Sequence, residues 1–330
     1  MKRRKPGLVI GGLLAVWVGF VITGGEGESV QVTIPAGSTL PAVSEILEAH
    51  DVIGSATLFQ LYTRARRGDR KLKAGTYQLA TRTSMRDVLT RLTRGEVMTV
   101  AMTIPEGFQL QQMAQRIAEV TGLSNDEVRE TLTDSLLEDV HSVPGPGLEG
   151  YLFPDTYRFA EAVPVDAVLD AMVARYRAVW TPQRLALLDR SGMTEREIVT
   201  LASIIQAEAR HVSEMPRISG VYHNRLEAGW LLQADPTVLF ALGGYRARLL
   251  YAAIDSVEDH PYNTYSQRGL PPGPIGAPGE AAIDAALSPE DHDFMYFVAW
   301  PDGSHVFTRS LAEHNRAKED ARSARTSDRS

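Results

Sequence analysis

The segment that most constrains the fold is residues 194–211, which the sequence predicts to be one long helix. Thr194 and Glu197 form the capping-box pattern of a helix start, and neither Gly nor Pro interrupts the segment. At about 100° per residue, its larger apolar side chains gather on one broad face. These are Ile198, Leu201, Ala202, Ile204 and Ile205. A helix with such a face is expected at the centre of a packed domain.

Glu208 projects from this apolar face, four residues after Ile204 and seven after Leu201. Partial burial and the negative end of the helix dipole both disfavour a carboxylate, so we expect a raised pKa. A carboxylic acid that keeps its proton near neutral pH can act as a general acid. The alternative is a structural carboxylate that is paired with Arg210 or Arg225.

Composition excludes several functional classes. The 330 residues suffice for two domains, and the absence of cysteine excludes disulfides, a thiolate nucleophile and cysteine-bound metals. The formal charge is −7, and −11 without the four basic residues at positions 2–5, which argues against a nucleic-acid partner. No H-E-x-x-H or G-x-S-x-G pattern occurs, so we expect neither a metal nor another cofactor, and no serine-hydrolase site.

The N-terminus predicts a membrane anchor. Residues 7–24 are almost wholly apolar and uncharged, and residues 1–6 are basic, so we expect a transmembrane helix with a cytoplasmic N-terminus. The remaining chain, after a linker at 25–29, would then be extracytoplasmic. A cleaved signal peptide is the alternative.

The pattern after the linker predicts an α+β fold in two parts. Residues 30–98 read as strand 30–34, helices 40–50 and 55–66, strand 75–80 and helix 84–93. Six basic residues within 64–73 indicate a solvated face, or alternatively a contact with a membrane or an anionic polymer. Residues 99–317 read as a larger mixed domain, and we expect disorder over 318–330. The elements predicted for the larger domain are strand 100–104, a helix from Leu110, helices 124–140, 165–180, 182–191 and 218–228, a hairpin at 294–308 and a helix after Ser310.

Two further segments have the character of a sugar-binding surface. The Pro- and Gly-rich segment 262–279 should be a stiff loop, and it carries Tyr262, Asn263, Thr264 and Tyr265. Aromatic faces and fixed polar groups suit sugar rings. Segment 149–157 has the same composition, with Glu149 and Tyr151. The alternatives are a structural Ω-loop and core residues next to a turn.

Several motifs, taken in order, resemble the endolytic murein transglycosylases of the YceG-like family. They are I-P-E-G at 104–107, E-G-Y-L-F-P-D-T-Y at 149–157, L-A-S-I-I-Q-A-E-A at 201–209, N-R-L at 224–226, L-Q-A-D-P-T at 232–237, Y-N-T-Y at 262–265, G-L-P-P-G-P-I at 269–275 and H-N at 314–315. The resemblance implies a single-pass inner-membrane protein with a LysM-like module before an extracytoplasmic, periplasmic-side catalytic domain. It implies cleavage of the MurNAc–GlcNAc β-1,4 bond within nascent peptidoglycan strands, leaving 1,6-anhydro ends. Peptidoglycan synthases and the division machinery are candidate partners.

The family's catalytic glutamate corresponds to Glu208, and many members carry an earlier Glu where this chain has Gln206. One glutamate could protonate the leaving oxygen and then accept the proton of the attacking C6 hydroxyl. Our candidates for holding the glycan are Gln233, Tyr262, Asn263, Thr264, Tyr265 and Tyr151, with Asp235 and Glu149 as further carboxylates. A carboxylate close to Glu208 would favour a muramidase-type hydrolase. A non-catalytic, membrane-anchored glycan-binding scaffold is the remaining alternative.

Overall fold

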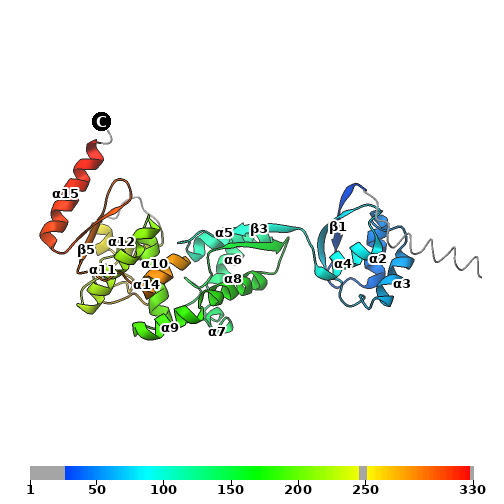
Figure 1. Ribbon diagram of the computed structural model, residues 1–330, viewed down its shortest axis with the longest axis horizontal. Coiled ribbons are helices and arrows are strands. Elements are labelled where there is room, and N and C mark those ends of the chain that lie inside the picture. The colour runs from blue at the N-terminus through cyan, green and yellow to red at the C-terminus, as the bar shows by residue number, and fades with distance from the viewer. Residues whose placement is uncertain (1–26, 245–250, 328–330) are drawn as a thin grey trace, which may run out of the picture. The chain divides into compact units, whose positions relative to one another are not determined.

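The computed structural model describes residues 27–244 and 251–327. The chain divides into two compact units. Among the described residues, unit 1 contains 27–101 and 158–163, and unit 2 contains 102–157, 164–244 and 251–327. Figure 1 shows the elements of both units, which mix helices with short two-stranded sheets, as expected for an α+β protein. The predicted anchor at 7–24 lies outside the described residues, and no helix within them is long and apolar enough to cross a membrane.

Unit 1 has the predicted order of strand, two helices, strand and helix. Strand β1 (Ser29–Ile34) pairs antiparallel with β2 (Gly75–Ala80). Helices α2 (Leu40–Ala49), α3 (Ala56–Ala65) and α4 (Met85–Arg94) enclose one apolar core against this ribbon. The basic side chains predicted to form a solvated face are all exposed. They are Arg64, Arg66, Arg67, Arg70, Lys71 and Lys73.

Strand β3 (Thr99–Thr103) was predicted, but its partner β4 (Thr156–Ala160) was not. Tyr157 of β4 is the last residue of the 149–157 segment that the sequence suggested for sugar binding. Helix α5 (Leu110–Thr121) follows as predicted. The predicted helix 124–140 is instead two helices, α6 (Asn125–Leu132) and α7 (Leu137–Val140). Polar side chains cause the break, because Thr133 bonds back to the carbonyl of Arg129 and Asp134 accepts from the backbone N–H of Leu136.

Helices α8 (Val165–Val179) and α9 (Pro182–Ser191) lead into the central helix α10 (Glu195–Glu208). After the short turn η1 (Val212–Glu214), α11 (Met215–Glu227) follows. The sequence did not predict α12 (Asp235–Ala241), α13 (Tyr251–Asp255) or α14 (Glu280–Leu287). Helix α10 packs against α11, α12 and α14, and its predicted apolar residues are all fully buried in the main core.

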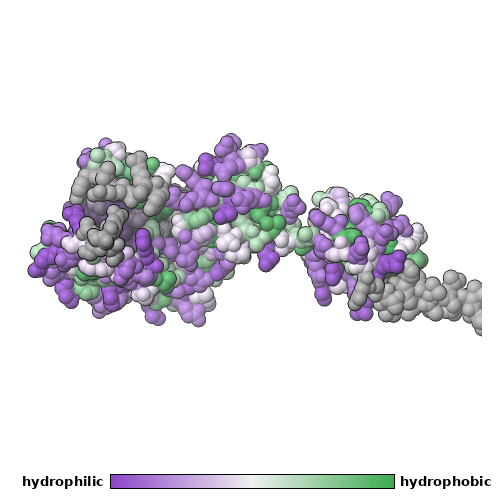
Figure 2. All heavy atoms as spheres, turned by 90° about the horizontal axis from the view of Figure 1, so that it is seen from above, coloured by the Kyte–Doolittle hydropathy of each residue, from purple (hydrophilic) through white to green (hydrophobic). Residues whose placement is uncertain are grey.

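The C-terminal region forms a hairpin and a long helix. Strands β5 (Tyr296–Ala299) and β6 (His305–Thr308) pair antiparallel as predicted, and α15 (Leu311–Ser327) packs on them. The expected disorder from residue 318 is wrong for 318–327, which continue α15. Ala317 and Ala321 are buried there, so the helix has an anchored side despite its charged composition. Figure 2 shows that the visible face of each unit is mostly hydrophilic, with apolar residues in scattered patches.

Candidate active site

The predicted capping box starts α10 and thereby sets where Glu208 lies. The Thr194 Oγ1 accepts from the backbone N–H of Glu197 at 3.3 Å, and the Glu197 carboxylate accepts from the backbone N–H of Thr194 at 2.7 Å. The helix ends at Glu208, because Ala209 adopts an extended conformation. Glu208 therefore occupies the last helical position, three residues before the predicted end, with its backbone at the negative end of the helix.

Glu208 is half-buried and accepts a hydrogen bond of 3.0 Å at Oε1 from the hydroxyl of Tyr222 on α11. Burial raises its pKa to about 7, and the negative charge of Asp235 acts in the same direction. The Tyr222 hydrogen bond and the charge of Arg225 oppose this rise. A substantial fraction of the Glu208 carboxyl groups therefore carries a proton at neutral pH, as a general acid requires.

Arg225 acts on Glu208 through its charge and not as a partner in an ion pair. Its buried guanidinium donates through Nε to the carbonyl of Met295 at 2.8 Å and through NH1 to the carbonyl of Leu232 at 2.6 Å. Through those bonds, α11 holds both the segment before α12 and the start of the hairpin in place. The structural ion pair between Glu208 and Arg225 that the sequence left open is therefore not formed.

Asp235 and Tyr265 lie beside each other near Glu208. The Tyr265 hydroxyl donates to Oδ1 of Asp235, the first residue of α12. Asp235 is exposed, and Tyr265 is half-buried. Gln233 is also exposed, with a positive φ of 50° and its backbone N–H bonded to the carbonyl of Thr264 at 3.0 Å. The start of α12 and the 262–279 loop therefore bring the side chains of Asp235 and Tyr265 close to the carboxyl group at the end of α10.

Asn263 and Thr264 belong to the interior of the loop. Both are almost completely buried. The Asn263 amide donates to the carbonyls of Ile254 and Val257, each at 3.0 Å, and Thr264 Oγ1 accepts from the backbone N–H of Ala234 at 2.9 Å. Asn263 thus holds the loop against the end of α13, and Thr264 holds it against the start of α12. The structure thus gives both residues a scaffold role, in contrast to the sugar contact that we expected.

Glu149 and Tyr151 form hydrogen bonds with other residues and not with Glu208. Tyr151 is fully buried, and its hydroxyl donates to the carbonyl of Gly145 at 2.8 Å, which makes it a core residue and not a sugar contact. Both carboxylate oxygens of Glu149 accept from the backbone N–H of Leu110 at 3.3 Å, and burial raises its pKa to about 8. Burial raises the pKa of half-buried Tyr262, and the charge of Glu149 acts in the same direction. Of the two further carboxylates, Asp235 and Glu149, only Asp235 raises the pKa of Glu208.

Tyr222 is the site residue that sequence reasoning missed. The sequence does place Tyr222 and Arg225 on one face of the predicted helix, because they are three residues apart. No local pattern, however, connects either residue to Glu208. Gln206 also has a structural role: its Oε1 accepts from the backbone N–H of Gly279, at the start of α14, at 3.0 Å. Among residues 27–244 and 251–327, no group of three His, Asp or Glu side chains is arranged to hold a metal ion.

Comparison with known proteins identifies the family of the chain. The model of the YceG-like family matches residues 32–320. The chain is 34% identical over 308 residues to the endolytic murein transglycosylase of Bacillus subtilis, with 88% of this chain and 84% of that protein covered. The protein of the same name from Streptococcus pneumoniae is 30% identical over 322 residues, and the match covers 87% of this chain but only 57% of that longer protein. A crystal structure of a YceG-like protein from Listeria monocytogenes matches with a TM-score of 0.61 at 33% identity, covering 88% of this chain and 99% of that one.

Proposed function

The chain belongs to the YceG-like family, and from this premise we propose that it is an endolytic murein transglycosylase with Glu208 as its single general acid and base. The observation that carries the proposal is the half-buried carboxyl at the end of α10, whose pKa is raised to about 7. The substrate is the glycan strand of peptidoglycan, cut within the strand at the MurNAc–GlcNAc bond.

In the proposed reaction, protonated Glu208 first donates its proton to the glycosidic oxygen as the bond from that oxygen to C1 of the muramic acid breaks. The C6 hydroxyl of the same sugar then attacks C1, and the Glu208 carboxylate accepts its proton. The product is a 1,6-anhydro sugar, no water is consumed, and the acid is regenerated. The N-acetyl group of the substrate can stabilise the positive charge that develops at C1.

We assign glycan contacts to the accessible side chains of residues 233–235 and 262–265. Gln233, Asp235, Tyr262 and Tyr265 keep surface open to solvent, and the two tyrosines offer rings for stacking on sugars. Asn263, Thr264, Tyr151 and Glu149 support this surface from inside. Residues 30–98 serve in this proposal as the LysM-like glycan-binding module, and residues 7–24 as the membrane anchor that leaves the catalytic part outside the cytoplasm.

A muramidase-type hydrolase is a second candidate, and one observation favours it. Asp235 is close enough for its charge to raise the pKa of Glu208, and it is exposed. A second carboxylate could activate water for attack at C1, in which case the new ends would be reducing sugars.

Product analysis tests the proposal. Purified uncrosslinked glycan strands are incubated with the protein, and the new ends are identified by mass spectrometry. Lytic cleavage gives 1,6-anhydro ends, hydrolysis gives reducing ends that are heavier by one water, and a non-catalytic scaffold leaves the strands intact. Glu208→Gln should abolish cleavage while retaining strand binding, whereas the same change at exposed Glu130 on α6 serves as the control. Anhydro ends formed by the Glu208→Gln variant would refute the assigned role.

A further inference from the structure

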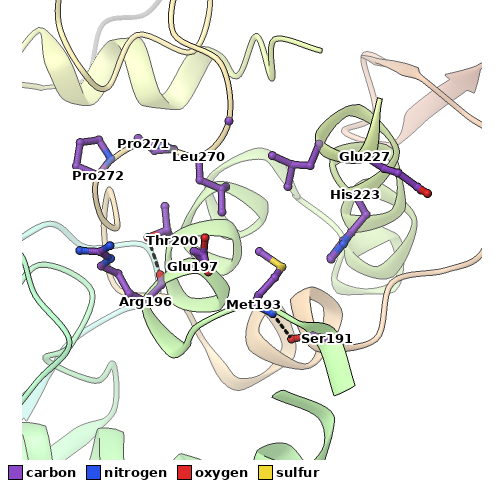
Figure 3. Close-up of a pocket in the computed structure, with 12 residues that line it drawn as sticks. Ser191, Met193, Arg196, Glu197, Thr200, His223, Glu227, Leu270, Pro271 and Pro272 are labelled. Carbon is purple, nitrogen blue, oxygen red and sulfur yellow. Dashed lines mark hydrogen bonds between the residues drawn. The ribbon is translucent and has the colours of Figure 1, made fainter. Parts of the chain in front are cut away.

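Unit 2 contains a cavity of about 550 Å³ that the reaction at Glu208 does not use. The N-terminal half of α10, the C-terminal half of α11 and residues 269–272 of the Pro-rich loop form it (Figure 3). Neither Glu208 nor any of the residues that we assign to the glycan lines it. We therefore expect the cavity to bind a ligand group other than the sugar that reacts.

Glu197, one residue of the cavity wall, leaves α10 on the same side as Glu208. Glu197, which lines the cavity, precedes Glu208 by eleven residues on the helix. At about 100° and 1.5 Å per residue, the two side chains leave the helix about 20° apart around its axis and about 16 Å apart along it. The 262–279 loop also serves both places, with Tyr265 beside Asp235 and Leu270 at the cavity. A strand bound at Glu208 would therefore lie within reach of the cavity through a side branch.

The cavity wall carries charges of both signs. The exposed guanidinium of Arg196 has no ion pair or hydrogen bond to any described residue. Exposed Glu227 lies on the opposite side of the cavity in Figure 3. Glu197 is also anionic, because its hydrogen bonds with Thr194 lower its pKa. Leu270 and other apolar side chains lie between these charges. Such a wall suits a short chain with a carboxylate, an amine and small apolar groups, and suits neither an uncharged sugar nor a polyanion.

We propose that this cavity binds the peptide branch of a murein strand, with the branch carboxylate at Arg196 and its free amine at Glu227. The proposal rests on the proposed function, because murein carries such a peptide on every muramic acid unit. Binding a branch away from the scissile bond would make the protein prefer strands that still carry peptides over bare strands.

The test compares two substrates, namely uncrosslinked strands with their peptides and the same strands after an amidase has removed them. We measure KM and kcat of the full-length protein on each. Wild-type protein should have the lower KM on the peptide-bearing strands. Arg196→Ala should raise that KM about tenfold, the usual value of a lost charge-assisted hydrogen bond, and should leave the KM on bare strands at the wild-type value. Glu227→Gln should act in the same direction.

Arg129→Ala is the matched control, because Arg129 is an exposed arginine on α6 that is not in the cavity wall. It should leave both KM values unchanged. Equal KM values of the wild type on the two substrates, or equal effects of Arg196→Ala on both, would overturn the peptide site while leaving the proposed activity intact. Absence of cleavage by the wild type on either substrate would instead refute the proposed function itself.

Discussion

The hydroxyl of Tyr222 donates a 3.0 Å hydrogen bond to Oε1 of Glu208, and so connects the helix that carries the acid to the helix that packs beside it. Tyr222 is buried, and its ring packs edge to face on Phe297 of β5. The C-terminal hairpin therefore supports the tyrosine that orients the carboxyl group. Only one of the two Glu208 oxygens is committed to this bond, which leaves the other for the substrate.

Tyr222→Phe removes a hydrogen bond that favours the ionised form of Glu208, so the pKa of Glu208 should rise. The alkaline limb of the kcat/KM profile should then shift to higher pH by about one unit, the scale of a hydrogen bond to a charged group. We expect kcat at the optimum to fall about tenfold, because the carboxyl loses its orientation. A pH–rate series on uncrosslinked strands measures both effects. A limb that moves to lower pH would contradict this role.

Asp235→Asn should move the same limb in the opposite direction. The Asp235 charge raises the pKa of Glu208, so its removal should shift the alkaline limb to lower pH, by about half a unit for a partly screened charge. Anhydro products should persist, because Glu208 acts alone in the proposed reaction. If Asp235 activates water instead, the variant should lose reducing-end products, which mass spectrometry would detect.

Glu149 should make the folded state pH-dependent. Its pKa is about 8 in the folded protein against an ordinary value of 4.5, so it contributes stability below pH 4.5 that is lost as the pH rises towards 8. Glu149→Gln cannot ionise, and its amide oxygen can still accept from Leu110. The variant should therefore lose less stability than the wild type between pH 5 and pH 8, by about 2 kcal/mol for a half-buried group. Urea unfolding at the two pH values measures the difference, and equal losses would refute the burial argument.

Thr264→Val tests the scaffold role of the loop. The substitution keeps the shape but leaves the backbone N–H of Ala234 without its acceptor, and Thr237 loses a 2.9 Å contact. We expect the free energy of unfolding to fall by about 1–3 kcal/mol. Chemical denaturation measures this change. Unchanged stability together with weaker glycan binding would restore Thr264 to the sugar contacts that the sequence suggested.

Local patterns in the sequence predicted much of the fold. The capping box at Thr194, the two strand segments at 30–34 and 75–80 and the turn before His305 are all encoded within a few residues, and the structure contains the corresponding helix, ribbon and hairpin. Helix α14 was missed because its start depends on a distant contact, the hydrogen bond from Gly279 to Gln206. The helical tail was missed because its buried alanines depend on packing against the hairpin.

The site was predictable where it depends on one helix and unpredictable where helices meet. The position of Glu208 on an apolar face followed from spacing alone. Its bond to Tyr222 did not, because that requires the packing of α11 on α10. Similarly, Asn263 and Tyr265 look alike in sequence as polar loop residues, and only the folded loop turns one inward to backbone carbonyls and the other towards Asp235.

The most direct test of the account is the pKa of Glu208 itself. Protein labelled with ¹³C at the glutamate carboxyl carbon is titrated by NMR, and the Glu208 signal is identified by its absence from the Glu208→Gln variant. We predict a midpoint of about 7, and we expect cleavage to fall as the pH rises through the same value. A midpoint near the ordinary value of 4.5 would show that Glu208 is ionised at neutral pH and cannot supply the proton on which the proposed reaction depends.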